Sequence, residues 1–585
     1  MSARLAHRGP DGAGTLDEGC VAFGHRRLSI IDLAGGAQPI WNEDRTLAIV
    51  LNGEIYNHRA LRVALQARHG FRTRSDTEVL LHLWEEEGEA MLPRLRGMFA
   101  FALWDASARR LWLARDAFGE KPLYWARGPF GLAFASELPA LRAGGFDLGG
   151  LDRAALADYL ALLYVPAPRT ILVGAHKLPA GHLLAADERG VEVRRWYALP
   201  VPGSAGPPDP ERLAATLTEA VRLRLESDVP VAALLSGGLD SSAVVALLAQ
   251  ATGPGLRTFS VGFGEADDEL PFARLVAERY RTQHTELLVA PDALAQTEEA
   301  FSACSEPFGD SSMVPTVAVC KAVAREVKVV LTGDGGDELF AGYGRTRLAG
   351  SLPRSRLLGG ALSLLSRLPG PRARSLGRAG RALSSLGLAR AVALLEVFSP
   401  GERSLLLGPS APAPGHAALL EDLAARLPAG ALDEDAALAF DLAVYLPEDL
   451  LVKSDLASMH SSLEGRAALL DTELASLAVP APARDKLAAP EGKALLRTAV
   501  RGLLPPEILA RRKRGFGAPV AAWLAGPLAP LLRERVLSPR ALLKDHLEAK
   551  AVDGVAREAL VGRGNPHQAW ALLALESWLL LSRAK

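Results

Sequence analysis

The sequence predicts an α/β multidomain protein with a layered antiparallel N-terminal region and a parallel α/β C-terminal region. Its 585 residues exceed what one hydrophobic core holds. Residues 21–197 contain short β-prone runs separated by turns, whereas buried-type apolar strands alternate with helices beyond residue 210. The first pattern predicts antiparallel sheets, and the second predicts one parallel sheet with helices between its strands.

The first elements of the N-terminal region are predicted from turn and cap signals. A glycine- and proline-containing loop follows a short helix end, and β-prone runs follow it. Ser75 and Glu78 have the spacing of a capping box, which predicts a helix start at Ser75. The predicted elements are a helix end over 1–5, a loop over 7–14, a strand over 21–33 and helices over 55–69 and from 75 onward.

A proline- and glycine-rich stretch, "LPVPGSAGPPDP" (199–210), predicts the linker between the two domains. The predicted boundaries are therefore 1–198, 199–210 and 211–585. Within the second domain, residues 345–440 are rich in Leu, Arg, Ala and Ser and predict a helical insertion without chemistry of its own. Pro353, Pro369 and Pro371 interrupt the leucine repeats, which favours core packing over a coiled coil.

The charge balance of the chain favours small molecules over nucleic acids or membranes as its binding partners. Lys and Arg total 66 against 67 for Asp and Glu, so no net charge attracts the chain to nucleic acid or an anionic membrane. The apolar stretch "QAWALLALESWLLL" is too short to span a bilayer and contains Glu576, which predicts a core helix. Cys20, Cys304 and Cys320 are few and far apart, and no secretory signal precedes them, so we expect a reducing cytoplasm.

The loop "LLSGGLDSS" (234–242) carries the chemistry of the second domain. It lies between a buried strand and a helix N-terminus, where α/β sheets bind anionic ligands. Gly237 and Gly238 let the backbone approach a phosphate, and Asp240 is suited to hold Mg²⁺. No Lys follows the glycines, which excludes a Walker A loop. A bare Ser-Gly-Gly is explained equally well as a turn whose serine caps a helix.

Four motifs in this region resemble the ATP-pyrophosphatase superfamily and, within it, the asparagine synthetase family. They occur in the family's order: "LLSGGLDSS" (234–242), "LTGDGGDELFAGY" (331–343), "YLPEDLLVKSDLASMHSSLEGRAALLD" (445–471) and "GLLPPEILARRKRGFGAPVAAW" (502–523). The resemblance implies a synthetase domain that uses ATP and Mg²⁺ to adenylylate a carboxylate.

The same resemblance implies roles for individual residues. Asp334 and Lys513 correspond to catalytic positions, although Lys513 alone is explained as a solvated lysine in a basic run. Asp240 and Asp337 correspond to metal-binding positions. The positions that contact ATP are Leu235, Ser236, Gly237, Gly238, Asp240, Ser241, Val261, Thr332 and Gly333.

The N-terminal region resembles a class II glutamine amidotransferase domain of the Ntn type. The motifs are "HRGPDGAG", "GHRRLSIIDLAGGAQPI", "LNGEIYNH" and "RSDTEVLL". The resemblance implies that Arg27, Asn52, Gly53, Glu54 and Asp76 bind glutamine. Arg27 suits its α-carboxylate, Asp76 its α-ammonium, and Asn52 with the Gly53 amide an oxyanion. Taken singly, Arg27 is explained as an exposed strand residue and Asn52-Gly53 as a hairpin turn.

In that family the nucleophile is a cysteine that follows the initiator methionine. We expect the sequence as written to be N-terminally truncated relative to the family, either because Met1 is an internal methionine or because the glutaminase has been lost. Cys20 is predicted to lie within a strand and has no free α-amine, so it cannot replace that nucleophile. The chain as written is therefore expected to use free ammonia.

We expect the protein to convert aspartate to asparagine through β-aspartyl-AMP, with nitrogen from glutamine or ammonia. Leu456 replaces an Arg of the family pattern, and a Pro is lost before "LLD", while Glu464 and Arg466 persist. These changes leave open another acceptor carboxylate, as in β-lactam synthetase-like or sugar-amidating relatives. A non-catalytic glutamine or nucleotide sensor is the alternative of another class. The oligomeric state is open, with a homodimer as one option.

Overall fold

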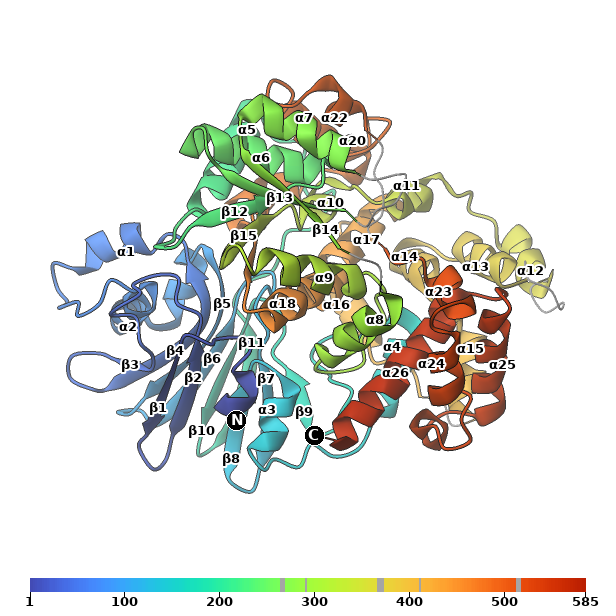
Figure 1. Ribbon diagram of the computed structural model, residues 1–585, viewed down its shortest axis with the longest axis horizontal. Coiled ribbons are helices and arrows are strands. Elements are labelled where there is room, and N and C mark those ends of the chain that lie inside the picture. The colour runs from blue at the N-terminus through green and yellow to red at the C-terminus, as the bar shows by residue number, and fades with distance from the viewer. Residues whose placement is uncertain (263–268, 290–291, 366–372, 410–411, 512–516, 585) are drawn as a thin grey trace.

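The computed structural model describes residues 1–262, 269–289, 292–365, 373–409, 412–511 and 517–584. Figure 1 shows antiparallel sheets at the lower left, a parallel sheet at the top, and a mass of helices on the right. The two predicted sheet types are confirmed, because strands of the N-terminal region pair antiparallel and strands of the C-terminal region pair in parallel. The exact domain boundaries stay a prediction.

A six-stranded antiparallel sheet in the order β11-β10-β6-β5-β4-β3 forms the centre of the N-terminal region. A β1-β2 hairpin and a β8-β7-β9 sheet accompany it. The strands are β1 (Gly12–Asp17), β2 (Ala22–Arg27), β3 (Ile40–Trp41), β4 (Leu47–Ile55), β5 (Gly97–Asp105), β6 (Arg110–Arg115), β7 (Tyr124–Gly128), β8 (Gly131–Ala135), β9 (Ala175–Lys177), β10 (His182–Asp187) and β11 (Gly190–Arg195).

The central sheet is buried on both faces, as the alternation along β4 shows. Ile49 and Leu51 pack with α1 (His58–Leu65) and α2 (Asp76–Glu87), whereas Ala48 and Val50 pack toward the hairpin and the smaller sheet. Successive side chains of a strand point to opposite faces, so this alternation produces layers of helices, sheet and further sheet. The layered antiparallel fold is therefore confirmed.

Several predicted boundaries in this region are wrong. The strand predicted over 21–33 ends at Arg27, because the Arg27 side chain donates to the carbonyls of Ile31, Asp32 and Leu33 and holds those residues in a loop. The helix predicted over 55–69 is limited to α1, and the predicted helix end over 1–5 is a short 3₁₀ helix, Ser2–Leu5.

The predicted capping box is half formed. Ser75 is the N-cap of α2 and accepts from Thr77 N, as expected of a capping serine. The Glu78 carboxylate does not return to Ser75 in this structure, since it accepts instead from the backbone amides of Arg72 and Thr73. Glu78 therefore ties the segment before α2 to the helix and leaves the capping to Ser75.

The C-terminal region contains a five-stranded parallel sheet in the order β14-β13-β12-β15-β16. Its strands are β12 (Val231–Leu234), β13 (Arg257–Gly262), β14 (Gln283–Leu288), β15 (Val329–Thr332) and β16 (Glu464–Ala467). From β12 the chain proceeds outward to β14 and then returns to place β15 on the other side of β12. The switch point of the sheet lies between β12 and β15, where open α/β sheets bind ligands at the carboxyl ends of their strands.

Helices cover both faces of this sheet (Figure 1). Ala233 and Leu331 pack in one core with α5, α6 and α7, whereas Ala232 and Val330 pack in another with α8, α9 and α18. These helices are α5 (Pro210–Leu223), α6 (Leu239–Thr252), α7 (Leu270–Tyr280), α8 (Ala293–Ser302), α9 (Met313–Val323) and α18 (Leu451–His460).

The other helices surround these layers. They are α3 (Leu138–Ala143), α4 (Arg153–Leu162), α10 (Gly336–Phe340), α11 (Gly344–Ser351), α12 (Arg356–Leu365), α13 (Ala373–Ser384), α14 (Gly387–Leu395), α15 (Pro400–Leu407), α16 (Ala417–Arg426), α17 (Asp433–Phe440), α19 (Thr472–Ala478), α20 (Ala483–Lys486), α21 (Ala494–Ala499), α22 (Pro506–Ala510), α23 (Val520–Ala525), α24 (Ala529–Arg535), α25 (Ala549–Leu560) and α26 (Pro566–Ala584). Short 3₁₀ helices cover Gly88–Arg94 and Leu542–Asp545, and a π-helix covers Asp441–Leu450.

The predicted core helix near the C-terminus is confirmed as α26. Trp570 and Leu572 are buried in the core, and the buried Glu576 accepts from the amides of Leu542 and Leu543. Its charge therefore satisfies the start of the 3₁₀ helix at Leu542. Across the described ranges, no helix combines the length and apolar character needed to cross a bilayer.

Candidate active site

The loop after β12 turns sharply against α7 before α6 begins. Gly237 has φ of +70°, and a Cβ atom there would lie 2.6 Å from Phe272 Cβ and 2.7 Å from Ala273 N. Only glycine fits this conformation and spacing. Gly238 follows as the N-cap of α6, and the hydroxyls of Ser236 and Ser241 lie 3.1 Å apart across the turn. The loop thus presents backbone amides and hydroxyls at a helix N-terminus, a favourable site for an anion.

The loop after β15 packs directly on the first loop. A Cβ atom at Gly336 would lie 2.6 Å from Asp240 Cγ, so the close approach of the two loops needs a residue without a side chain. Asp240 in the first turn of α6 and Asp337 in the first turn of α10 are thereby brought together at the switch point. Both residues were predicted to bind metal.

Lys493 joins these two carboxylates. Its Nζ contacts the Asp240 carboxylate and lies 2.6 Å from Asp337 Oδ1. Burial acts to lower the pKa of Lys493, but the carboxylates of Asp240 and Asp337 outweigh it and hold that pKa above its usual range. A buried ammonium group therefore stands between the two predicted metal ligands.

This arrangement fits a divalent cation. Two aspartates that reach a single ammonium group can also reach a single metal ion, and carboxylate oxygens are the ligands that Mg²⁺ prefers. Binding of Mg²⁺ between them would displace the Lys493 ammonium toward another anion. In an ATP site that anion is the polyphosphate.

A cavity of about 610 Å³ lies beside these loops and collects most of the predicted ATP-binding residues. Its lining includes Leu235, Ser236, Gly238, Asp240, Ser241, Val261, Thr332 and Gly333. Gly237 supports the turn without being among the lining residues. Asp334, predicted to be catalytic, also lines the cavity, and its Oδ2 accepts from Thr332 Oγ1 at 3.0 Å and Ser454 Oγ at 2.9 Å.

Two lysines in this cavity were missed by sequence reasoning. Lys493 lies in "EGKALLR", outside the motifs, and no local signal identifies it. Lys453 lies inside a recognised motif, and its Nζ donates to Asp310 Oδ2 at 2.9 Å and Ser312 Oγ at 2.8 Å. Lys513, the lysine that the motif did predict, falls outside the described residues, so its role stays a prediction.

A second cavity, of about 650 Å³, lies in the N-terminal region. Its lining includes all the residues predicted to bind glutamine, namely Arg27, Asn52, Gly53, Glu54 and Asp76. They come from β2, β4 and the start of α2. The fold therefore gathers at one cavity residues that are spread over fifty positions of the sequence.

Asn52 and Asp76 present suitable groups to this cavity. Asn52 Nδ2 is buried and has no hydrogen-bond partner within the described part of the chain, as expected of a donor that awaits an oxyanion. Asp76 is buried, and burial raises the pKa of its carboxyl, while Oδ2 accepts from Ile55 N at 2.8 Å. Burial also raises the pKa of Glu54, with Asp76 and Glu464 adding to the effect.

Arg27 and Cys20 differ from the simple predictions. The Arg27 guanidinium lines the cavity but already donates to loop carbonyls, Ile31 O at 2.9 Å and Asp32 O at 2.7 Å among them. Cys20 was predicted to lie within a strand, and that is wrong: it lies in the turn between β1 and β2, where Gly19 has φ of +75°. Cys20 is exposed and lines the edge of the cavity.

A buried charged wall separates the two cavities. Asp455 Oδ1 accepts from Arg8 NH2 at 2.9 Å, and Lys121 Nζ lies 3.3 Å from the same oxygen. Met459 and Glu464 line the N-terminal cavity, and their neighbours Ser458 and Gly465 line the other. The two cavities therefore share α18 and β16 as a common wall.

The departures from the family pattern lie on this wall or behind it. Leu456 is buried in the hydrophobic core and is not among the lining residues of the 610 Å³ cavity. Arg466 is fully buried, and its Nε donates to Glu464 Oε1 at 2.8 Å. The lost Pro corresponds to Ala468, directly before "LLD", and its neighbour Ala467 does line the cavity. Leu456 therefore lies outside this cavity, whereas the second departure lies next to a residue that lines it.

Comparisons with known proteins agree with both halves of this description. The family model "Asparagine synthase" matches residues 212–580, and "Glutamine amidotransferase domain" matches residues 1–197. A Mycobacterium bovis protein provisionally named as a glutamine-hydrolysing asparagine synthetase is 35% identical over 90% of this chain and 84% of its own length. Asparagine synthetase [glutamine-hydrolyzing] 1 of Bacillus subtilis is 30% identical over 99% of this chain and 92% of its own length. Asparagine synthetase [glutamine-hydrolyzing] 3 of the same organism is 30% identical over 88% and 83%.

Proposed function

The chain belongs to the asparagine synthase family, whose members are ligases, and from this we propose that it converts aspartate to asparagine through a β-aspartyl-AMP intermediate. The nitrogen comes from glutamine or from free ammonia. The observation that carries the proposal is the meeting of Asp240, Asp337 and Lys493 at the switch point of the parallel sheet. None of the three cysteines, all of them in described segments, forms a disulfide, which supports a cytoplasmic reaction.

The loops after β12 and β15 suit ATP. Gly238 begins α6, so the amides of its first turn and the Ser236 and Ser241 hydroxyls offer donors to the pyrophosphate part. Val261 and Thr332 lie at the ends of β13 and β15, where they can contact the adenosine part. The acceptor carboxylate would then bind in the part of the 610 Å³ cavity that ATP leaves open and attack the α-phosphorus of ATP.

Negative charge accumulates in this step because one anion attacks another and pyrophosphate leaves. Mg²⁺ held by Asp240 and Asp337 would neutralise part of that charge. Lys493, displaced from the two carboxylates, would hold the leaving pyrophosphate by its ammonium group. Asp334, oriented by Thr332 and Ser454, is placed to accept a proton when ammonia attacks the acyl adenylate.

The N-terminal cavity supports recognition of glutamine. Asp76 and Glu54 offer buried carboxyl groups to its α-ammonium, whose positive charge would favour their ionised forms, and Arg27 offers a guanidinium to its α-carboxylate. Asn52 Nδ2 and the Gly53 amide would bind the oxyanion formed during amide hydrolysis. Because α18 and β16 border both cavities, ammonia released in one would have a short path to the other.

Exchange of labelled pyrophosphate into ATP tests the adenylation step directly. Wild-type exchange should require both Mg²⁺ and aspartate. Asp240→Asn should reduce it by about two to three orders of magnitude, the cost of losing one charged group that acts on the reacting phosphates. Asp422→Asn is the control. Asp422 is exposed, accepts from Arg195 at 2.8 Å, and is not among the residues that line the 610 Å³ cavity.

The exchange assay also separates the alternatives. Exchange that needs a carboxylate other than aspartate would favour a β-lactam synthetase-like or sugar-amidating enzyme. Binding of ATP without exchange for any acceptor would favour a sensor. Exchange that is undiminished in Asp240→Asn would contradict the assignment of Asp240 to the metal.

A further inference from the structure

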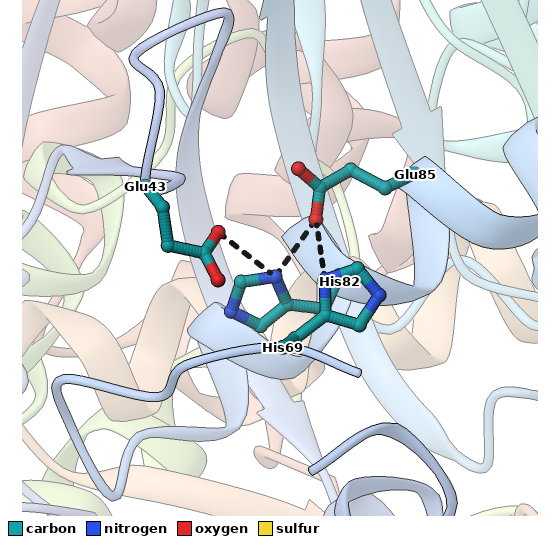
Figure 2. Close-up of side chains that lie close together, drawn as sticks. All are labelled: Glu43, His69, His82 and Glu85. Carbon is teal, nitrogen blue, oxygen red and sulfur yellow. Dashed lines mark hydrogen bonds and ion pairs between the residues drawn. The ribbon is translucent and has the colours of Figure 1, made fainter. Parts of the chain in front are cut away.

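We propose that Glu43, His69, His82 and Glu85 form a binding site for a divalent transition metal, with Zn²⁺ as the best-suited ion. The four side chains converge on the helical face of the N-terminal region, as Figure 2 shows. None of them lines either of the two cavities described above. The site is therefore separate from the proposed synthetase and glutamine chemistry.

The spacing of the four groups suits a small metal ion. One ligand atom from each residue can be chosen so that all lie within 4.8 Å of one another. Glu85 Oε2 lies 2.8 Å from His82 Nδ1 and 3.3 Å from His69 Nδ1, and Glu43 Oε2 lies 3.6 Å from His82 Nδ1. Zinc bonds of about 2.0–2.2 Å in tetrahedral geometry place neighbouring ligand atoms roughly 3.3–3.6 Å apart. Only small side-chain movements separate this arrangement from a coordination shell.

The two carboxylates are already oriented by their second oxygens. Glu43 Oε1 accepts from Gly70 N at 2.8 Å, which leaves Oε2 toward His82. Glu85 Oε1 accepts from Asn42 Nδ2 at 2.7 Å, which leaves Oε2 toward both imidazoles. Such hydrogen bonds to the outer atoms of ligands are a regular feature of protein metal sites, because they fix the direction of the inner atoms.

His69 is oriented in the same manner. His69 Nε2 lies 2.9 Å from Glu86 Oε1, which is the carboxylate–histidine pair that commonly supports a metal ligand. His82 is fully buried, its Nε2 has no hydrogen-bond partner among the described residues, and the nearest carboxylate oxygen is Glu78 Oε1 at 4.0 Å. The ring of Phe71 packs edge-on against His82, with centroids 4.6 Å apart.

A divalent ion would satisfy the inward-facing atoms of this cluster. A neutral imidazole has a single N–H, and in His69 the contact with Glu86 uses it at Nε2. The lone pair at His69 Nδ1 then faces Glu85 Oε2 at 3.3 Å, which is repulsive unless a cation lies between the two atoms. A proton at His69 Nδ1 would relieve that contact alone, whereas a divalent ion would also bind Glu43 Oε2, which lies 3.6 Å from His82 Nδ1, beyond hydrogen-bond distance. One divalent ion satisfies both imidazoles and neutralises both carboxylates.

The topology indicates a structural role. Glu43 comes from the loop between β3 and β4, His69 from the segment after α1, and His82 and Glu85 from successive turns of α2. Four protein ligands leave no open position for a substrate, as in structural zinc sites. The ion would therefore tie α1 and α2 to the edge of the central sheet, and α2 is the helix that begins at Asp76 in the glutamine cavity.

Metal binding by the full chain tests the proposal. Chelator-treated protein is dialysed against Zn²⁺, passed through a desalting column, and analysed for bound zinc, with Co²⁺ as a spectroscopic substitute. We expect one tightly held equivalent of Zn²⁺ per chain and the intense visible absorption of four-coordinate Co²⁺. The variants Glu43→Gln and His69→Ala, whose side chains are not fully buried, should each weaken binding at least tenfold.

A control variant distinguishes this site from general surface binding. His460 lies 3.9 Å from Glu299, which gives an imidazole–carboxylate pair without further ligands, so His460→Ala should retain the full equivalent. Zn²⁺ should also raise the thermal midpoint of the wild type and of His460→Ala, and not that of Glu43→Gln. Absence of stoichiometric zinc in the wild type would overturn the proposal. So would zinc binding by Glu43→Gln and His69→Ala that is as tight as that of the wild type.

Discussion

Replacing Lys493 with Met removes the buried ammonium that joins Asp240 to Asp337 while keeping most of the side-chain volume. In the proposed reaction this ammonium leaves the carboxylates when Mg²⁺ binds and then holds the departing pyrophosphate. Two consequences follow from one substitution. The rate of adenylation should fall, and Mg²⁺ should bind more readily because no internal cation competes for the two carboxylates.

The size of the effect follows from the contacts of Lys493. A pair of unit charges about 4 Å apart is worth roughly 4 kcal/mol at the effective dielectric constant of a protein site. The cost of desolvating the ammonium offsets part of that attraction, and the loss of one charged or polar donor to a transition state typically costs about 3–4 kcal/mol. Lys493→Met should therefore lower the rate of pyrophosphate exchange by about 10²- to 10³-fold, with a smaller change in the KM for ATP.

The assay is exchange of labelled pyrophosphate at a series of Mg²⁺ concentrations. Lys486→Met is the matched control, because Lys486 is also fully buried but is not among the residues that line the 610 Å³ cavity. Its Nζ donates to Val479 O at 3.1 Å. Lys486→Met should keep exchange within about threefold of wild type. Exchange by Lys493→Met at the wild-type rate, or an unchanged Mg²⁺ requirement, would refute this reasoning.

The remaining predictions concern the second cavity, the basic run, and Glu120, a buried residue that precedes Lys121 of the wall and lines the 610 Å³ cavity. Asp76→Asn should weaken glutamine binding at least tenfold in calorimetry because a buried carboxylate is lost, whereas the exposed control Asp147→Asn should not; equal affinities would remove Asp76 from the site. Burial, reinforced by Asp116, raises the pKa of Glu120 from 4.5 to about 8. The folded chain then retains a proton that the unfolded chain loses between these values, so stability should fall as pH rises from 4.5 to 8. The thermal midpoint of Glu120→Gln should fall less across that pH window than the midpoint of the wild type. Parallel plots of midpoint against pH for the two proteins would contradict the raised pKa of Glu120. Lys513→Ala should lower turnover about a hundredfold or more with little change in ATP binding, and similar small losses at Arg512, Lys513 and Arg514 would favour a solvated basic surface.

Local patterns predicted the sheets and the two loops of the synthetase cavity. The apolar runs at 231–234 and 329–332 identify buried strands, and the glycines and aspartates that follow them are contiguous in sequence. Parallel strands bring such loops to one edge of a sheet, so Asp240 and Asp337 could be expected to meet. Their placement depends on short-range signals and on a rule of topology.

Lys493 shows what local patterns cannot predict. It lies 253 residues from Asp240, and its contact with the two carboxylates depends on how α21 packs beside the loops. The cluster of Glu43, His69, His82 and Glu85 has the same origin, since only His82 and Glu85 share a recognisable helical spacing. Long-range side-chain clusters of this kind need the tertiary structure.

Some local predictions failed because side chains compete with backbone propensity. The β-prone sequence around Cys20 suggested a strand, but Gly19 adopts a positive φ and the Cys20 amide donates to Glu18 O, which makes a hairpin turn. The run after Arg27 suggested a longer strand, but the Arg27 guanidinium binds the carbonyls of 31–33 and keeps them from a sheet. Cys20 and Arg27 both line the 650 Å³ cavity.

Product analysis tests the central claim most directly. The purified full-length chain is incubated with aspartate, ATP and Mg²⁺, and with either ¹⁵N-ammonia or amide-labelled ¹⁵N-glutamine, and all products are quantified together. The account predicts asparagine with ¹⁵N in its side-chain amide, formed in equal amounts with AMP and pyrophosphate from at least one nitrogen source. Formation of ADP and phosphate, or of AMP without labelled asparagine, would contradict it.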